Sequence, residues 1–286
     1  MSKATLGAYA RLMRLDKPVG IYLLLWPTMW ALLMAAQGLP PLNILVIFVA
    51  GVVVMRSAGC VINDYADRKV DGSVKRTSAR PLATGEVTPK QALTLFGGLI
   101  ALAFVLVLFL NWQTIALSVV ALLLASSYPF MKRYTHLPQV VLGAAFGWAI
   151  PMAFMAVLET VPAYAWWLFV ANLLWTVAYD TMYAMVDRDD DLQIGVKSTA
   201  ILFGKNDVRI IMLLQATALI ILWCIGFVID ATWPYYGAIL FSALLCVRQY
   251  QLIKRRQREG CFKAFLENHY IGLAITLGTA LHFYLA

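Results

Sequence analysis

A run of mainly apolar residues, 43–62, leads directly into the stretch Asn63-Asp64-Tyr65-Ala66-Asp67-Arg68-Lys69-Val70-Asp71. The run is long enough to cross a bilayer, so the aspartates that follow it lie where a membrane helix leaves the hydrocarbon. Carboxylates are costly at that boundary and need a compensating partner. On a continuing helix Asn63, Asp67 and Asp71 would share one face, because each is four residues after the previous one. Such a face of oxygen ligands suits a hard divalent cation such as Mg²⁺.

The composition is that of an integral membrane protein. The 286 residues are 62% hydrophobic and 13% charged, with a mean hydropathy of +0.75, values far from those of soluble domains. Residues 1–17 contain basic side chains but no short apolar core with a cleavage site, so we expect no cleavable signal. A net charge of +8 would indicate nucleic-acid binding in a soluble protein. Membrane topology explains it here, and we expect no nucleic-acid partner.

Apolar segments of about twenty residues predict nine membrane spans. We place them at 19–36, 43–63, 92–110, 113–130, 138–157, 163–186, 208–229, 233–250 and 268–285. All 23 Lys and Arg residues lie before the first span, at Arg56 within the second, or around the segments that follow even-numbered spans. The positive-inside rule then puts the N-terminus in the cytoplasm and the C-terminus on the other side. The expected fold is therefore all-α, one domain spanning 1–286, with nine transmembrane helices in one bundle.

A second acidic cluster follows the sixth predicted span, in the stretch 179–191. Its segment Asp187-Arg188-x-x-Asp191 repeats the pattern Asp67-Arg68-x-x-Asp71. Asp180, Tyr183, Asp187 and Asp191 would again share one helical face. Because both clusters are predicted at the cytoplasmic side, we expect the two faces to converge on a cavity that opens there. Asp189 and Asp190 face other directions and are interpreted as solvated surface acids.

Helix capping or pairing with nearby Lys and Arg residues is the simpler explanation of these acids. An aspartate near a helix C-terminus opposes the helix dipole, however, so a cation is needed to offset it. Acidic clusters interleaved with basic residues at a membrane surface favour a metal-bridged diphosphate, with the basic side chains neutralising the leaving group. The surrounding hydrocarbon-rich protein favours a lipid tail on that diphosphate. The chemistry expected from the residues is therefore transfer of a prenyl group from its diphosphate.

The two acidic stretches resemble the signature motifs of the UbiA superfamily of intramembrane prenyltransferases. The resemblance extends to Arg14-Leu-Asp-Lys17-Pro18, to Tyr128-Pro-Phe-Met-Lys-Arg-Tyr134-Thr-His-Leu-Pro-Gln and to the stretch 195–204, and it covers essentially the whole chain. Within the superfamily the chain is similar to the bacterial 4-hydroxybenzoate polyprenyltransferases of ubiquinone biosynthesis. The resemblance implies a multi-pass protein of the bacterial inner membrane. It also implies Mg²⁺-assisted transfer of a long polyprenyl group from polyprenyl diphosphate to the ring carbon ortho to the hydroxyl of 4-hydroxybenzoate.

Motif positions in this resemblance imply residue roles. The implied catalytic residues are Asp67, Asp71, Asp187 and Asp191. The implied metal ligands are Asn63, Asp64, Asp67, Asp71, Asp180, Asp187 and Asp191. The candidate substrate-binding residues are Arg133, Lys75, Arg80, Lys132, Lys197, Arg14, Lys17, Arg56, Tyr128 and Tyr183. Arg133 is expected to hold the acceptor's carboxylate, since it lies at a cytoplasmic helix end outside both motifs, and Arg14, Lys17, Arg56 and Lys197 compete for that role or for diphosphate. Tyr128 and Tyr183 are expected to stabilise the allylic cation through their rings.

The remaining residues give weaker signals. The four cysteines have no C-x-x-C spacing and the three histidines form no ligand pattern, so a zinc or haem site has no support. The many Trp, Phe and Met residues of the spans are expected to pack or to face lipid rather than to line a tail tunnel. The basic run 254–258 is explained by attraction to anionic lipid.

Two alternatives stay open. The acceptor could be another aromatic compound used within the same superfamily, because the acidic motifs do not distinguish acceptors. A cation transporter would belong to a different class and would place acids near the bilayer midplane, on a route to both surfaces. Of the motif acids only Asp180 is expected to lie deep, which favours the enzyme. A purely structural scaffold would tolerate loss of Asp67 or Asp187.

Overall fold

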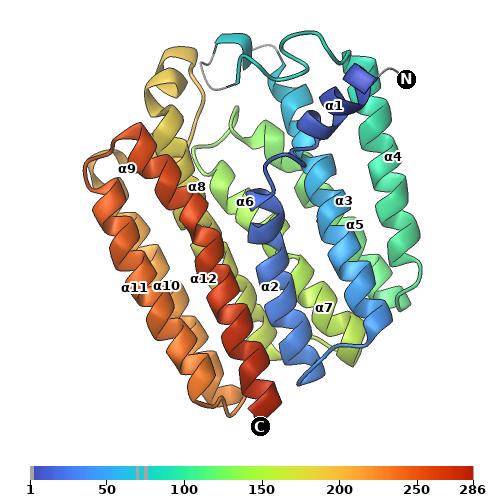
Figure 1. Cartoon of the computed structure of the whole chain (residues 1–286), viewed down its shortest axis with the longest axis vertical. Coiled ribbons are helices and arrows are strands. Elements are labelled where there is room, and N and C mark those ends of the chain that lie inside the picture. Colours follow the sequence, from blue (N-terminus) through green and yellow to red (C-terminus); the bar gives the residue numbers. More distant parts are fainter. Residues whose placement is uncertain (1–2, 69–70, 74–76, 286) are drawn as a thin grey trace.

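The computed structural model describes residues 3–68, 71–73 and 77–285, and every regular element in these ranges is helical. In chain order the elements are α1 (Lys3–Leu12), α2 (Val19–Ala36), α3 (Leu42–Asp67), η1 (Asp71–Ser73), α4 (Pro89–Val107), α5 (Trp112–Met131), α6 (Pro138–Gly147), α7 (Ala149–Leu158), α8 (Ala163–Ile194), α9 (Thr199–Phe203), η2 (Gly204–Asn206), α10 (Asp207–Val228), α11 (Trp233–Ile253) and α12 (Arg258–Leu285). The long helices run side by side in one bundle (Figure 1).

Helices occupy all nine positions at which spans are predicted. Among the described residues, seven segments are long and apolar enough to cross a membrane: Val19–Ala36, Leu42–Asp67, Pro89–Val107, Trp112–Met131, Pro138–Leu158, Thr199–Val228 and Trp233–Ile253. The chain is therefore a multi-pass, all-α membrane protein. The helices α8 and α12 extend beyond the predicted spans and are not in this set. The nine-span count stays a prediction.

Local sequence explains several helix ends. Asn111 begins α5, because its side chain accepts a hydrogen bond from the Thr114 backbone N–H. The predicted fifth span is broken into α6 and α7 around Trp148. Pro151 lacks an N–H and leaves the Gly147 carbonyl without its usual donor, which favours the break. The helix α8 continues past the predicted boundary through its aspartates and ends at Gly195, whose φ of 73° is left-handed.

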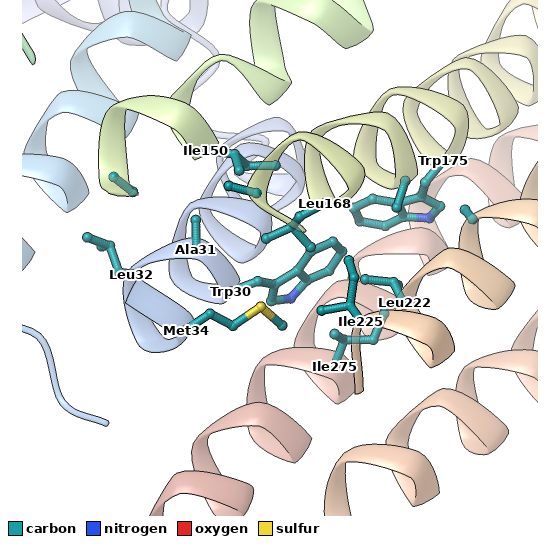
Figure 2. Packing of buried hydrophobic residues seen from close by; sticks show 14 of the residues in the cluster. Trp30, Ala31, Leu32, Met34, Ile150, Leu168, Trp175, Leu222, Ile225 and Ile275 are labelled. Atoms are coloured by element: carbon teal, nitrogen blue, oxygen red, sulfur yellow. The ribbon is translucent and has the colours of Figure 1, made fainter. Parts of the chain in front are cut away.

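Three helices meet in the buried core around Trp30 of α2 and Trp175 of α8, whose ring centroids are 5.5 Å apart (Figure 2). Both indole N–H groups find partners on α12. Trp30 Nε1 donates to Thr276 Oγ1 at 2.9 Å, and Trp175 Nε1 donates to Asn268 Oδ1 at 3.0 Å. Because lipid offers no hydrophobic drive for helices to associate, close packing and such hydrogen bonds hold α2, α8 and α12 together.

The helices α4 and α5 pack less completely than the helices of this core do. The helix α4 contacts α3 closely but hardly touches α5, although α4 and α5 are consecutive in the chain. At the upper end of the bundle in Figure 1 lie the end of α3, the linker to α4 and the last turns of α8. We call this the acidic end, since Asp67 and Asp191 both lie there. The C-terminus lies at the opposite end (Figure 1).

Close packing of α12 on α11 depends on Gly278. A Cβ atom there would lie 2.4 Å from Ala238 Cβ and 2.9 Å from the Pro234 carbonyl oxygen. We expect Gly278→Ala to lower the free energy of unfolding by about 1–3 kcal/mol, because the two helices must separate. The measurement is the thermal midpoint in detergent.

The matched control is Gly237→Ala on α11, where nothing lies within 4 Å of an added Cβ. This control should keep or slightly raise the midpoint, since alanine favours a helix more than glycine does. An unchanged midpoint for Gly278→Ala would contradict the close approach of α11 and α12.

Candidate functional site

A cavity of about 1410 Å³ extends from the acidic end into the bundle. Its wall is formed by residues of α1 to α8, η1 and α12 and of the segments that join these elements. Charged side chains gather in one part of the wall, and apolar side chains line the rest. The cavity can therefore hold a ligand with one anionic end and one hydrocarbon end.

The first acidic cluster enters this cavity from two elements. Asn63, Asp64 and Asp67 lie in the last turns of α3, whereas Asp71 begins the separate 3-10 helix η1. The expectation of one continuous helical face through Asp71 is therefore wrong, because α3 ends at Asp67. Asp71 is followed by Gly72, a pair of residue types typical of turns.

Asp64 is almost completely buried, at 1% exposure, and contacts two arginines. Arg14 Nη2 donates to Asp64 Oδ1 at 2.8 Å and to Oδ2 at 2.9 Å. Arg80 Nη1 lies 3.0 Å from Asp64 Oδ1. Arg14 belongs to the joint between α1 and α2, and its φ of 58° is in the left-handed region. The ion pairs therefore hold the segment that connects α1 and α2 against the end of α3.

Arg80 also sets the position of Asp71. Its Nη1 donates to Asp71 Oδ1 at 3.0 Å and to Oδ2 at 2.9 Å. Burial raises the pKa of the Asp71 carboxyl above its ordinary value, Arg80 opposes this shift, and the charge of Asp67 adds to it. Arg80 therefore offsets part of the electrostatic cost of burying Asp71.

Within the described part of the chain, Asp67 is paired through one of its two carboxylate oxygens. Lys132, which follows α5, contacts Asp67 Oδ2. Asp67 Oδ1 is buried and has no hydrogen-bond partner among the described residues. A buried carboxylate oxygen without a donor favours an additional cation at this place.

The second acidic cluster lies in the wall of the same cavity. Asp180, Tyr183, Asp187 and Asp191 all line it from α8, as the helical spacing predicts. The structure thus brings the two acidic faces, far apart in the sequence, to one cavity. Asp189 and Asp190 lie outside the cavity wall and pair with Arg258, whose Nη2 is 3.2 Å from Asp189 Oδ2 and 3.1 Å from Asp190 Oδ1. Asp189 is a solvated surface acid, as predicted, whereas Asp190 is more buried, and both are held by an ion pair that the sequence did not predict.

Most of the predicted basic and aromatic candidates also line the cavity. They are Arg14, Lys17, Arg56, Arg80, Lys132, Lys197, Tyr128 and Tyr183. The structure does not place Arg133 in the cavity wall. Its Nη2 donates to the Ala66 carbonyl at 2.5 Å, and its guanidinium carbon lies 5.8 Å from the Phe130 ring centroid. Lys75 lies outside the described residues.

Arg56 lies deeper, in the middle of α3. Its Nη1 is 2.5 Å from Cys60 Sγ, and its Nε is buried with no hydrogen-bond partner in the described ranges. A Cβ at Gly20 would lie 2.3 Å from Arg56 Nε, so the guanidinium rests against the backbone of α2. Tyr128 and Tyr183 lie close enough to the Arg56 guanidinium to interact with it electrostatically. A guanidinium with an unpaired N–H at this depth can bind an anionic group in the cavity.

Sequence reasoning missed two features of the wall. His269 of α12 lines the cavity, and its Nδ1 lies 2.6 Å from the Leu266 carbonyl oxygen. A single histidine gives no spacing signal, so no motif could have found it. Phe48, Phe104 and Phe146 also line the cavity, together with Met55 and Met152. Of these residues, Phe48, Phe146 and Met152 also pack in the core around Trp30, in line with the packing role predicted from sequence.

The described residues contain no group of three or more His, Cys, Asp or Glu side chains placed to hold one metal ion. The acids of α3 and η1 are instead balanced by Arg14, Arg80 and Lys132. The donor set nevertheless fits a hard cation, because it consists of carboxylate oxygens and includes the unpaired Asp67 Oδ1.

Comparisons with known proteins agree with this geometry. A family model described as "UbiA prenyltransferase family" matches residues 24–274. A protein named 4-hydroxybenzoate octaprenyltransferase from Pseudoalteromonas atlantica is 65% identical over 285 residues, covering 100% of both chains. A protein of the same name from Escherichia fergusonii is 61% identical over 284 residues, covering 99% of this chain and 98% of that one.

Solved structures share the fold. The apo structure of a UbiA homolog from Aeropyrum pernix K1 superposes with a TM-score of 0.80 at 24% identity, covering 92% of this chain and 97% of that one. A UbiA homolog from Archaeoglobus fulgidus, bound to GPP and Mg²⁺, superposes with a TM-score of 0.74 at 18% identity, covering 96% of this chain and 99% of that one. At these identities the likeness establishes the fold alone.

Proposed function

This chain belongs to the UbiA prenyltransferase family, and we propose that it transfers a long polyprenyl group from polyprenyl diphosphate to 4-hydroxybenzoate, as a step of ubiquinone biosynthesis. The prenyl group joins the ring carbon ortho to the hydroxyl, giving 3-polyprenyl-4-hydroxybenzoate and diphosphate. The observation that carries the proposal is the end-to-end identity of 60–65% with proteins named for this activity. Their name indicates an octaprenyl group as the one transferred.

The charged part of the cavity binds the diphosphate. Arg14, Arg80 and Lys132 line it beside the first acidic cluster, and Lys17 and Lys197 contribute further positive charge. These side chains donate hydrogen bonds to phosphate oxygens and stabilise the negative charge that develops as the diphosphate leaves. Arginine is suited to this task because its planar group binds two oxygens at once.

Mg²⁺ is the cofactor that we propose for this site. The residues that would hold it are Asn63, Asp64, Asp67, Asp71, Asp180, Asp187 and Asp191. When bound, Mg²⁺ would supply positive charge that neutralises the diphosphate leaving group.

The apolar part of the cavity holds the hydrocarbon chain and excludes water. Its lining includes Phe48, Phe104, Phe146, Met55 and Met152. In the transfer reaction, the bond breaks between the diphosphate oxygen and the first carbon of the prenyl group, C1′. Exclusion of water protects the resulting allylic cation from hydrolysis. Tyr128 and Tyr183 offer ring faces to that cation. The acceptor ring then bonds to C1′ and loses the proton of the same ring carbon, which restores its aromaticity.

Arg56 is the cation that we now propose for the acceptor's carboxylate, in place of Arg133. Arg56 lines the cavity and has a buried, unpaired Nε, whereas Arg133 contacts the Ala66 carbonyl outside the cavity wall. A carboxylate at Arg56 would leave the acceptor ring among Tyr128, Tyr183 and the deeper acid Asp180. Arg133 then supports the end of α3 that carries Asp64 and Asp67.

We also propose the membrane topology. The nine spans comprise the seven apolar segments together with α8 and α12, in a single domain. The acidic end faces the cytoplasm of a bacterial inner membrane, because Lys and Arg residues concentrate in the segments of that end.

The acceptor is tested by a panel of aromatic compounds assayed with one long prenyl diphosphate and Mg²⁺. Purified protein should prenylate 4-hydroxybenzoate, and should act at least about tenfold more slowly on benzoates or phenols that lack either the carboxylate or the hydroxyl. Mass spectrometry should locate the new bond ortho to the hydroxyl. A preference for naphthoate or homogentisate would contradict the proposed acceptor, and cation flux in liposomes without prenyl transfer would contradict the enzyme itself.

The carboxylate partner is tested by two matched substitutions. Arg56→Gln should raise the KM for 4-hydroxybenzoate by about tenfold or more, because a charge-assisted hydrogen bond is lost, with little change in the KM for polyprenyl diphosphate. Arg133→Gln removes the same charge outside the cavity wall and should change the acceptor's KM much less. The reverse pattern would restore Arg133 as the carboxylate partner.

A further inference from the structure

The last turns of α8 present two faces with different partners. Asp187 and Asp191 line the cavity. The three residues between them, Arg188, Asp189 and Asp190, all form ion pairs outside its wall. Every charged side chain between the two motif acids is thus held by another part of the chain.

Asp207, the first residue of α10, is the centre of these contacts and has 0% exposure. Its Oδ2 accepts from Arg188 Nη1 at 3.0 Å. Arg256 Nε lies 2.9 Å from Asp207 Oδ1 and 3.0 Å from Oδ2, and Arg256 Nη2 lies 2.7 Å from Oδ1. The same guanidinium also donates to the Lys205 carbonyl at 2.9 Å. One buried carboxylate therefore ties α8 to the start of α10 and to the loop before α12.

Arg258 adds a second connection on the surface. Its Nη2 is 3.2 Å from Asp189 Oδ2, and its two terminal nitrogens contact both oxygens of Asp190 at 3.1 and 3.2 Å. We call the six residues Arg188, Asp189, Asp190, Asp207, Arg256 and Arg258 the α8 clamp. Its three arginines balance its three aspartates, so the clamp is neutral as a whole.

The α8 clamp offsets the unfavourable concentration of negative charge in the second acidic cluster. Four aspartates occur between positions 187 and 191, close to a helix C-terminus, where the helix dipole disfavours negative charge. Repulsion among these acids would open the last turns of an unsupported helix. The clamp places arginine charge against the outer side of these turns and leaves Asp187 and Asp191 to the cavity.

We propose that the α8 clamp, with Asp207 as its main positioning residue, fixes Asp187 and Asp191 for binding a divalent cation and the diphosphate of the prenyl donor. This proposal rests on the proposed function for the identity of the donor. Asp207 lies outside the cavity wall and touches neither substrate. It acts through Arg188, the neighbour of Asp187, in the way that supporting hydrogen bonds orient metal ligands elsewhere.

The test compares Asp207→Asn with Glu267→Gln. The control removes the acidic partner of another arginine, since Arg248 Nε and Nη2 lie 2.8 and 2.9 Å from Glu267, but this pair joins α11 to α12 and leaves α8 untouched. In Asp207→Asn, hydrogen–deuterium exchange of the amides 187–194 should become at least about tenfold faster, and Mn²⁺ affinity measured by electron paramagnetic resonance should fall about tenfold. Glu267→Gln should change neither quantity.

Steady-state kinetics should show that Asp207→Asn weakens the use of Mg²⁺ and of the prenyl donor but not of the acceptor. The Mg²⁺ concentration for half-maximal activity and the KM for polyprenyl diphosphate should rise in Asp207→Asn, while the KM for 4-hydroxybenzoate stays within about twofold of the wild-type value. Arg258→Gln should act in the same direction but more weakly, because its ion pairs are half-exposed. This second variant decides the question if Asp207→Asn does not fold.

Unchanged exchange and Mn²⁺ affinity in folded Asp207→Asn, or in Arg258→Gln if only that variant folds, would overturn the proposal. Equal losses in Asp207→Asn and Glu267→Gln would do the same, since they would indicate a general loss of stability. Failure of the wild-type protein to transfer a prenyl group would instead refute the proposed function. The exchange and Mn²⁺ measurements would still report on the clamp in that case.

Discussion

Ionised carboxylates in a membrane-embedded cavity need cations beside them, and the acidic end of this protein is built around that constraint. Asp64, Asp67 and Asp71 are 1%, 4% and 4% exposed, and each contacts an arginine or a lysine. Removing one partner from a buried ion pair typically costs about 3–5 kcal/mol, so these acids are stable only with their partners in place. The partners come from the joint before α2, the linker after α3 and the end of α5. Charge compensation therefore draws three separate segments around one helix end, and in doing so it forms the charged wall of the cavity.

The same constraint applies to the second acidic cluster, which lines the cavity from α8. Next to the cavity acids of α8, Arg188 pairs with the buried Asp207, which also pairs with Arg256. Binding a diphosphate together with a divalent cation adds negative and positive charge at once, so the balance of both walls is kept. The apolar lining beyond them lets the hydrocarbon part of a prenyl donor stay in the bundle while its charged part lies among the basic side chains. Prenyl transfer is the chemistry that uses both parts of the cavity.

Much of this arrangement can be predicted from sequence, because helical periodicity is local. The apolar runs predict the helix positions, and the spacing of Asp180, Tyr183, Asp187 and Asp191 places them on one face, as observed. Periodicity fails where the helix stops, so it misplaced Asp71, which lies on a separate turn held by Arg80. The ion pair of Asp207 with Arg256 joins residues 49 positions apart and has no spacing signal. The position of Arg133 outside the cavity wall depends on how α5 ends, which its sequence alone does not determine.

In the proposed mechanism, two acidic clusters on different helices form one diphosphate site. Calorimetric titration of purified protein with inorganic diphosphate in the presence of Mg²⁺ tests it most directly. Asp67→Asn and Asp187→Asn should each weaken binding by about tenfold or more, because each removes a metal ligand from the same site. Asp230→Asn, in the loop between α10 and α11 at the other end of the bundle, should bind as the wild type does. Diphosphate affinity that survives unchanged in either motif variant would show that its cluster does not share the site.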